Sequence, residues 1–278
     1  MQLYNNTSSD ISRLVTRNYS TSFYTASSLL AKDIREAIFS IYGFVRFSDE
    51  IVDTFHEYNK KNLIEKFEKD YYDAVKDGIS LNPILNSFQE TVQKYGIPDE
   101  YVQAFLASMK NDLEKKDYES RSEMNEYIYG SADVVGLMCL KVFCNGDDRL
   151  FNELEKPAMR LGSAFQKVNF LRDLKNDIER LDRSYFPDVE DNQFTEEAKG
   201  KIVKDIEDDF RQALDGIKRL PSSSRLAVAV AFHYYRTLLK KIRSTSASGI
   251  KSRRIRISNF RKILLLVKTW FLVKTRII

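Results

Sequence analysis

The sequence predicts an all-α protein, and three observations support this. Only ten glycines and five prolines occur among 278 residues, so breaks between helices are few. Apolar residues recur at helical spacing through most of the chain. The stretch from Ala158 to Phe186 contains no proline and repeats Leu161, Phe165 and Val168 at that spacing. No domain boundary is apparent. We therefore expect residues 1–278 to form a single all-helical domain around one core, with a basic amphipathic tail at residues 251–278.

The composition narrows the class of protein. Hydrophobic residues make up 43% and aromatic residues 12%, which predicts an apolar interior larger than packing alone requires. Cys139 and Cys144 lack CxxC spacing, so we expect buried free thiols in a reducing cytoplasm. The first residues have no basic head followed by an apolar run, which predicts no signal peptide. No run of 18 apolar residues occurs, so no membrane-spanning segment is expected.

The net charge of +4 is unevenly distributed. Nine basic residues and no acidic residue lie between Lys251 and Ile278, which leaves 35 basic against 40 acidic residues elsewhere. The body of the protein therefore lacks the basic surface that nucleic acids require, and we expect no nucleic-acid partner.

The first helices are predicted from capping residues and apolar spacing. Asp10 is expected to cap a helix that carries Ile11, Leu14 and Val15. The serines at 20 and 22 then mark a turn that either caps a helix or offers donors to an anion. Asp33 is expected to cap the next helix, residues 34–55, whose core stripe consists of Ile34, Ile38, Ile41, Val45 and Val52.

The middle of the chain predicts three amphipathic helices and one strongly apolar helix. Residues 59–78 and 83–96 form two of them, and the third begins at Pro98. We interpret the charged end of the third helix as a solvated face: Asp112, Glu114, Lys115 and Lys116. The apolar helix covers residues 127–142, and its small residues favour close helix packing over space for a ligand: Gly130, Ser131, Ala132 and Gly136. Asp133 on this face has no explanation from the sequence.

The last third of the chain predicts two more helices and a tail. A charged helix ends at Leu220, and Pro221 precedes an apolar helix that ends at a flexible segment, residues 244–249. His233 is expected to be a core or cavity-lining residue, because no metal-ligand spacing surrounds it. The tail, with Trp270 among apolar and basic residues, suits either an anionic membrane surface or docking onto the body.

A polar stripe runs along the helix that begins near Ala158. At about 100° per residue, five residues fall on one narrow face: Gly162, Gln166, Asn169, Asp173 and Asp177. The two aspartates are one turn apart, and like charges at this spacing repel each other. A cation between them would remove the repulsion. A solvated helix face is the alternative interpretation.

A second stripe lies on the helix at residues 34–55. Four side chains fall within an arc of about 60°: Tyr42, Arg46, Asp49 and Asp53. A salt bridge between Arg46 and Asp49 is the alternative explanation for this pattern.

If these two helices face each other, four carboxylates surround one cavity. Oxygen ligands favour Mg²⁺, with Mn²⁺ as the substitute, and such ions bind diphosphate. Arg46 and the amides of Gln166 and Asn169 would bind the remaining phosphate oxygens. Departure of a metal-bound diphosphate from an allylic carbon leaves a carbocation, which needs a dry, aromatic cavity. The sequence therefore indicates a site that could ionise an allylic diphosphate.

The combined motifs resemble those of the squalene/phytoene synthases, the head-to-head prenyl-diphosphate condensing enzymes. The resemblance extends from Ser20 to about Ile257. The pattern as a whole is most similar to that of the bacterial phytoene synthases. It is carried by Ser20-Thr21-Ser22-Phe23, by Tyr42, Arg46, Asp49-Glu50-Ile51-Val52-Asp53, by Tyr127, Ala132 and Val135-Gly136, by Ala164-Phe165-Gln166, Asn169-Phe170-Leu171-Arg172-Asp173 and Asp177, and by Arg183-Ser184-Tyr185-Phe186-Pro187. Asp133 departs from the family pattern, which commonly has glycine there.

The resemblance implies an all-α isoprenoid-synthase bundle around a central cavity. It implies that Mg²⁺ is bound by Asp49, Asp53, Asp173 and Asp177, with Tyr127 beside them as a catalytic residue. It further implies that the substrate diphosphates contact Ser20, Ser22, Tyr42, Arg46, Gln166, Asn169, Arg172, Tyr235 and Arg254. The alignment of Tyr235 and Arg254 rests on weaker similarity than the other positions.

The implied reaction joins two geranylgeranyl diphosphates to phytoene through a cyclopropylcarbinyl (prephytoene) diphosphate, a step of carotenoid biosynthesis that needs no NADPH. Two alternatives stay open. One is a squalene or dehydrosqualene synthase that uses two farnesyl diphosphates, and the other is a non-catalytic helical scaffold. We expect a cytoplasmic protein, and a tail that binds membrane would place it at the inner face of that membrane.

Overall fold

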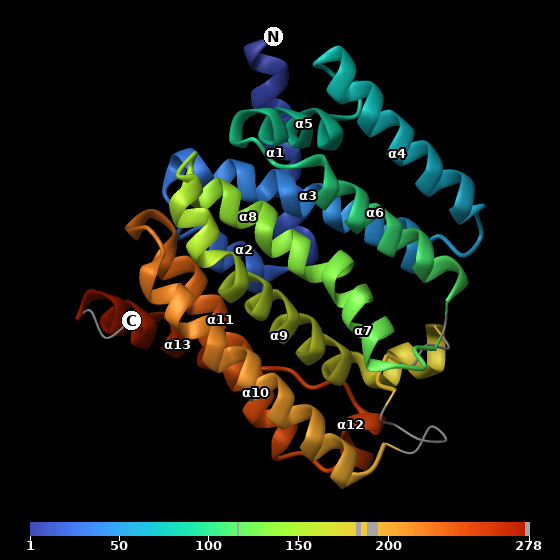
Figure 1. The fold of residues 1–278 in the computed structure, drawn as a ribbon, viewed down its shortest axis with the longest axis vertical. Coiled ribbons are helices and arrows are strands. Elements are labelled where there is room, and N and C mark those ends of the chain that lie inside the picture. The colour runs from blue at the N-terminus through green and yellow to red at the C-terminus, as the bar shows by residue number, and fades with distance from the viewer. Residues whose placement is uncertain (116, 182–184, 188–193, 276–278) are drawn as a thin grey trace.

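The computed structural model describes residues 1–115, 117–181, 185–187 and 194–275, and all regular elements in these ranges are helical (Figure 1). Within the helix that ends at Leu181, the side chains of residues 177 and 179–181 lie outside this description. The predicted all-α class is confirmed for the described residues.

The N-terminal half forms six helices, most of which lie in the upper part of Figure 1. They are α1 (Gln2–Tyr19), α2 (Thr21–Ser27), α3 (Lys32–Thr54), α4 (Lys60–Asp77), α5 (Pro83–Tyr95) and α6 (Asp99–Glu114). Ser20 separates α1 from α2, and its hydroxyl accepts a hydrogen bond from the Phe23 amide at 3.2 Å, so it caps α2. Gly78 and Gly96 end α4 and α5 in the left-handed conformation that glycine adopts readily.

Two predicted caps are wrong. The first helix begins at Gln2, so Asp10 lies in its interior. The mostly polar residues before Asp10 continue the helix towards the N-terminus. The third helix is capped at Ala31, and Asp33 lies in its first turn, where a negative charge favours the helix dipole without accepting a capping bond.

The centre of the fold is built from α7 (Arg121–Ile128), a π-helical turn η1 (Tyr129–Asp133), α8 (Val134–Cys144) and the long α9 (Asp148–Leu181). The single helix expected at residues 127–142 is therefore divided by the π-turn. Helix α9 begins ten residues before Ala158 and continues through Pro157. A Cβ atom on Gly216 would lie 2.3 Å from Pro157 Cβ, so glycine lets the neighbouring helix pack against this proline.

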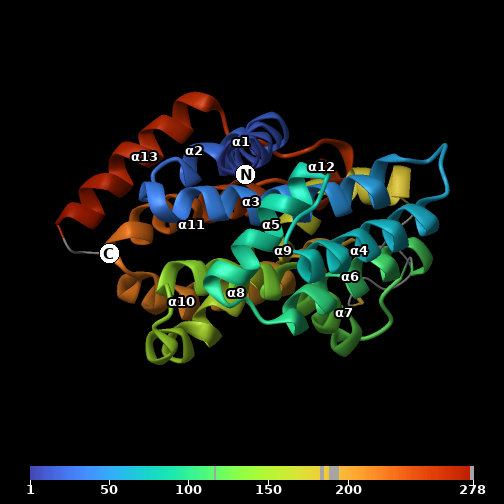
Figure 2. The same cartoon turned by 90° about the horizontal axis from the view of Figure 1, so that it is seen from above.

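The C-terminal part consists of α10 (Glu196–Arg219), α11 (Ser222–Arg243), α12 (Ala247–Ser252) and α13 (Asn259–Lys274). The segment expected to be flexible contains the start of α12, capped by Ser246, whose hydroxyl accepts a hydrogen bond from the Gly249 amide at 3.1 Å. Helices α9, α10 and α11 lie side by side, and α13 packs on the outside of α11 (Figures 1 and 2).

Two groups of buried apolar residues stabilise the fold. One includes residues of α3, α4, α5, α6 and α8, and within it Phe44 stacks on Phe88 with ring centroids 4.0 Å apart. The other joins α9, α10 and α11, and Val228 packs against both groups. Both cysteines are free thiols, as expected, but only Cys144 is buried and Cys139 is half-buried.

One stretch differs from the prediction that no segment could span a membrane. Residues Arg121–Cys144 have the length and mean hydropathy, 1.4, of a spanning helix. However, 56% of the apolar window is buried inside the fold, between α6 and α9. Burial of this kind is what the central helices of a packed core require.

Candidate active site

A polar chamber of about 790 Å³ lies where α3, α6, α7 and α9 converge. Its wall carries four carboxylates, Asp49, Asp53, Asp112 and Asp173, and three guanidinium groups, Arg46, Arg172 and Arg254. The other polar lining side chains include Ser20, Tyr42, His56, Tyr127, Ser131, Gln166, Asn169, Asn176, Tyr185 and Tyr235. Charges of both signs in one chamber suit a ligand that combines phosphate groups with cations.

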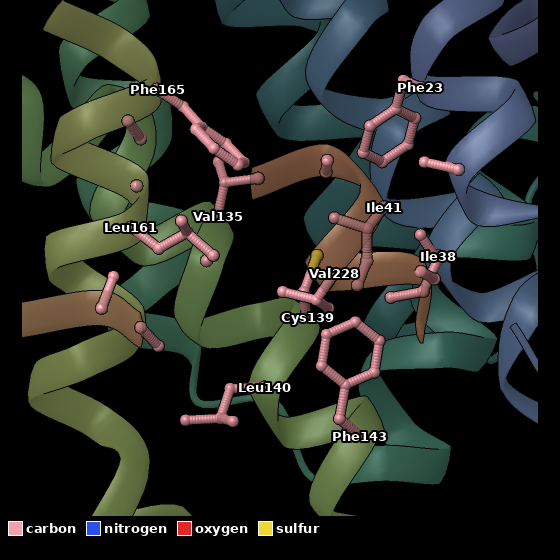
Figure 3. A pocket seen from close by; sticks show the side chains of 18 of the residues that line it. Phe23, Ile38, Ile41, Val135, Cys139, Leu140, Phe143, Leu161, Phe165 and Val228 are labelled. Carbon is pink, nitrogen blue, oxygen red and sulfur yellow. The ribbon is translucent and has the colours of Figure 1, made fainter. Parts of the chain in front are cut away.

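An apolar cavity of about 310 Å³ adjoins this chamber. Figure 3 shows Phe23, Ile38 and Ile41 on one side of it, and Leu161 and Phe165 on the other. Phe143 and Leu140 of α8 lie at one end of the view, and Val228 of α11 lies within it. Seven residues line both spaces, which therefore meet: Phe23, Tyr42, Val45, Ser131, Gln166, Asn169 and Tyr235.

The two polar stripes predicted from the sequence line the same space. Asp49 and Asp53 of α3 enter the polar chamber together with Asp173 of α9. Farther along α9, Gln166 and Asn169 lie where the chamber meets the apolar cavity, and Gly162 lines the apolar cavity. Asp177 belongs to α9, but its side chain is outside the described residues, as are Arg183 and Ser184.

Arginines bind the chamber carboxylates in this structure. Arg46 forms ion pairs with Asp49 and Glu50, which includes the salt bridge weighed as an alternative from the sequence. Arg254 Nε lies 2.7 Å from Asp173 Oδ1, and Arg172 also pairs with Asp173. Arg254 comes from the segment after α12, so the ion pair joins two distant parts of the chain. A bound diphosphate would compete with the carboxylates for these same guanidiniums.

The carboxyl of Asp49 is electrostatically strained. Burial and the negative charge of Asp53 raise the pKa of Asp49 to about 7, although Arg46 opposes the shift. Asp112 and Glu50 contribute in the same direction. A cation bound at this point would relieve the repulsion.

Tyr127 lies deep in the wall, 7% exposed, and its hydroxyl donates a hydrogen bond of 2.8 Å to Asp112 Oδ2. Burial and the adjacent Asp112 raise the pKa of Tyr127 well above its usual value, so the phenol stays protonated. Asp112 was expected on a solvated face, and this is wrong: the residue is 8% exposed and lines the chamber. The signal that could have found it is its place one turn after Met109, on the inward stripe of α6.

The junction of the two spaces is held by hydrogen bonds and aromatic stacking. The Tyr235 hydroxyl donates to Asn169 Oδ1 at 3.2 Å, and its ring stacks on Phe165 with centroids 4.0 Å apart. Tyr42 stacks on Phe23 at 4.7 Å, and burial raises the pKa of Tyr42 to about 12. Of the predicted serines, Ser20 lines the chamber, whereas Ser22 lines neither space.

The small residues of η1 and α8 have two roles. A Cβ on Gly130 would lie 1.9 Å from Ser108 Oγ, so this glycine serves close packing against α6, as favoured from the sequence. Ser131, Ala132 and Gly136 instead line the apolar cavity, which supports the alternative of space for a ligand. Asp133 is buried beside them and accepts a hydrogen bond from Ser163 Oγ at 2.9 Å.

The carboxylates of the chamber fit Mg²⁺ only if a bound phosphate supplies further oxygen ligands. Among the described side chains, no three His, Cys, Asp or Glu residues lie close enough to hold a metal by themselves. Mg²⁺ typically takes one or two carboxylates and completes its shell with water and phosphate oxygens. Asp49, Asp53 and Asp173 could supply those carboxylates from opposite helices, with phosphate between them.

Solved structures with the same fold include a dehydrosqualene synthase and a squalene synthase. A dehydrosqualene synthase superimposes with a TM-score of 0.83 over 99% of both chains at 21% identity. Squalene synthase HpnC from Alicyclobacillus acidocaldarius superimposes with a TM-score of 0.76 over 87% of this chain and 95% of that one, at 20% identity. At these identities the similarity establishes the fold, a helical bundle around a central cavity.

Sequence comparison provides the relationship. Phytoene synthase 3 of Zea mays is 29% identical over 274 residues, covering 92% of this chain, which spans only 64% of the maize protein. Phytoene synthase of Arthrospira platensis is 26% identical over 260 residues, covering 84% of this chain and 83% of that protein. The family model for squalene/phytoene synthase matches residues 16–261. The chain therefore belongs to the squalene/phytoene synthase family.

Proposed function

We propose that this protein joins two geranylgeranyl diphosphates head to head to form phytoene, with Mg²⁺ as the cofactor. The observation that carries the proposal is the direct connection between the charged chamber and the apolar cavity. Tyr42, Gln166, Asn169 and Tyr235 line both, so a molecule with a diphosphate head and a prenyl tail can occupy the two spaces at once.

The guanidiniums of Arg46, Arg172 and Arg254 bind the diphosphate oxygens in this scheme. Mg²⁺, when bound to the aspartates, neutralises the leaving diphosphate. Asp49 and Asp173 would then exchange their arginine partners for the metal. The ion pairs seen here thus hold these aspartates and arginines in position before the substrate binds.

The junction residues would hold the reacting carbons. In the first half-reaction, the C1–O bond of one substrate breaks, and the double bond of the second attacks C1. Loss of a proton then closes the cyclopropane ring. In the second half-reaction, the remaining C–O bond breaks, the cation rearranges, and loss of a proton gives the central double bond of phytoene. Aromatic rings of Phe23, Tyr42, Phe165 and Tyr235 stabilise positive charge there, and the apolar walls exclude water. No reductant is consumed.

The choice of a C20 substrate rests on the small side chains that line the apolar cavity: Ala26, Ser27, Ala132, Gly136, Ala158, Ala213, Gly216, Ala227 and Ala231. They leave room along α2, α8 and α11 for a long chain. The names of the related phytoene synthases point the same way. Condensation of two C15 farnesyl diphosphates is the second candidate, because solved structures of the same fold bear dehydrosqualene and squalene synthase names.

The decisive experiment incubates the purified protein with Mg²⁺ and either geranylgeranyl or farnesyl diphosphate, with and without NADPH, and identifies the hydrocarbon by mass spectrometry. We expect a C40 hydrocarbon with a central triene from the C20 substrate, whether or not NADPH is present. A C30 hydrocarbon as the only product would replace this proposal with the second candidate. Absence of any hydrocarbon with either substrate would favour the non-catalytic scaffold.

A further inference from the structure

Helix α13 presents an apolar face to solvent. Its six exposed large apolar side chains are 41 to 71% accessible: Phe260, Ile263, Leu264, Val267, Trp270 and Phe271. At about 100° per residue they fall within an arc of about 120°. The opposite side of the helix is anchored, because Thr269 is fully buried and Leu272 and Val273 pack against the core. Figure 2 shows α13 along the outside of the molecule.

This apolar face is unusual in size for a surface helix. Six neighbouring large side chains at these exposures leave on the order of several hundred Å² of contiguous apolar surface, at the upper end of what a monomer leaves exposed. Among the described residues, the other large apolar side chains that are more than half exposed lie in other parts of the chain: Met1 before α1, Leu3 and Leu14 on α1, Tyr58 before α4 and Leu81 before α5. A contiguous face of this size marks an interaction surface.

The surroundings of this face are strongly basic. Residues 222–274, which include α11 and α13, hold 13 of the 44 basic residues and none of the 40 acidic residues of the chain. The rest of the chain therefore carries 31 basic against 40 acidic residues. Arg261 and Lys268 flank the apolar face of α13, and both are exposed.

The basic groups of the two helices also lie close together. Burial, followed by the positive charges of Arg236, Lys268 and Lys240, lowers the pKa of His233 to about 4. Lys262 lies over the ring of Tyr234, 5.6 Å from its centroid. The α11–α13 pair thus combines an exposed apolar stripe with clustered positive charge and no described acidic side chain to neutralise it from within.

We propose that α13 docks this protein on an anionic lipid bilayer, with the apolar face among the acyl chains and the flanking basic groups among the headgroups. A bilayer supplies the apolar and the negatively charged surface that this helix matches. A second copy of the chain would bring the same positive charges face to face, so the charge argues against pairing through α13.

Docking by α13 places the cavities one helix away from the bilayer. Helix α11 carries α13 on its outer side, and Ala231 and Tyr235 of α11 line the cavity walls. A prenyl chain dissolved in the bilayer would thus have a short path to the cavity. The docking itself does not depend on the proposed reaction, because it concerns the surface of α13 alone.

Trp270 allows a direct test, because it is the single tryptophan of the chain and lies on the apolar face. The experiment mixes the full chain, without substrate, with vesicles of phosphatidylcholine alone or with half phosphatidylglycerol. We expect a blue shift of Trp270 emission, and quenching by brominated acyl chains, with the anionic vesicles only. Added salt should weaken the binding. Unchanged emission with anionic vesicles would overturn the proposal.

Two variants separate the contributions, and each is checked for folding by circular dichroism. We expect Phe260→Ser/Leu264→Ser/Phe271→Ser to weaken binding to anionic vesicles by at least roughly ten-fold, since three inserted side chains are lost. The control Leu3→Ser/Tyr58→Ser/Leu81→Ser removes three large apolar side chains elsewhere that are 69 to 95% exposed, and it should bind normally. Arg261→Gln/Lys268→Gln keeps the apolar face and should lose the preference for anionic lipid. An equal loss of vesicle binding in the control would refute bilayer docking. A blue shift that depends on protein concentration, together with dimers in sedimentation, would also refute it.

Discussion

The hydroxyl of Tyr127 donates a hydrogen bond of 2.8 Å to Asp112 Oδ2, and this contact joins α7 to α6 at the wall of the polar chamber. Asp112 in turn is near enough to help raise the pKa of Asp49, after burial and Asp53. The pair therefore connects a neutral, buried phenol to the carboxylates proposed to hold the metal.

Replacement of Tyr127 by phenylalanine should lower turnover and stability together. The change leaves Asp112 Oδ2 without this donor, which costs about 1–3 kcal/mol for a buried group. The control is Tyr95→Phe, which removes a hydrogen bond of 2.9 Å to the Asp33 carbonyl, far from the chamber. Thermal unfolding should shift comparably in both variants, and product formation should fall only in Tyr127→Phe. Equal activities would show that the Tyr127 hydroxyl is purely structural.

The local sequence offered one signal for the burial of Asp112, its place one turn after Met109, but the surrounding charge run obscured it. Its neighbours Glu114 and Lys115 are solvated or paired at the surface, and a charge run usually is. Asp112 is buried because α7 returns across α6 and brings Tyr127 to it, which is a tertiary contact. In contrast, the stripes with Asp49 and Asp173 follow from helical periodicity alone, and the structure brings both to one chamber.

The helices themselves were predictable where periodicity and breakers agree, as for Lys60–Asp77 and Pro83–Tyr95. Prediction failed where tertiary packing overrides local signals. Helix α9 continues through Pro157, although proline commonly ends a helix, because the neighbouring helices α8 and α10 pack against it. The tail could not be resolved between membrane binding and docking, since α13 has one apolar face for the body and another for solvent.

Removal of the carboxylate charge at Asp173 should abolish condensation if this residue holds Mg²⁺. Asp173→Asn should reduce turnover by at least roughly 100-fold, because even groups that only support a metal ligand cost about 10- to 100-fold. The control Asp70→Asn removes an exposed carboxylate paired with Lys66 on α4. The measurement is hydrocarbon formation over a Mg²⁺ titration. Normal turnover of Asp173→Asn at low Mg²⁺ would exclude the proposed role.

Arg254 should serve substrate binding more than the chemical step. It pairs with Asp173 and lines the chamber, whereas its neighbour Arg253 is exposed and lines neither space. Arg254→Gln removes a charged hydrogen bond worth about 1.5–3 kcal/mol, which corresponds to a KM roughly 10- to 100-fold higher. Arg253→Gln is the matched control. Steady-state kinetics would contradict this assignment if kcat fell and KM stayed constant.

Ser27 should influence the length of the accepted chain. It is buried and lines the apolar cavity, whereas the next residue, Ser28, lines neither space. Ser27→Phe fills part of that cavity, so the ratio of C20 to C15 turnover should fall by roughly 10-fold or more, as expected when several methylene groups lose their space. Ser28→Phe should leave the ratio unchanged. Competition between the two diphosphates, with both products quantified, gives the ratio, and equal ratios in both variants would refute the role of Ser27.

The buried carboxyl of Asp133 should make stability depend on pH. Burial raises its pKa to about 7, with the Ser163 hydrogen bond opposing the shift. The folded state therefore holds a proton that the unfolded state releases near its ordinary value, so this carboxyl costs stability as pH rises from about 4 to about 7. Above pH 7 the cost is complete, on the order of a few kcal/mol. Asp133→Asn should thus raise the free energy of unfolding at pH 8, with the gain shrinking towards pH 5.

The contrast with Asp209 makes this prediction specific. Asp209 is equally buried, but Lys167 Nζ lies 2.8 Å from its Oδ2 and Arg160 is also paired with it. Asp209→Asn leaves Lys167 without its buried partner and should destabilise the fold at pH 8, since breaking a buried ion pair is costly. Chemical denaturation of both variants at pH 5 and pH 8 tests the two signs together. If Asp133→Asn also lost stability at pH 8, its carboxylate would have to be ionised and favourably bound in the folded protein.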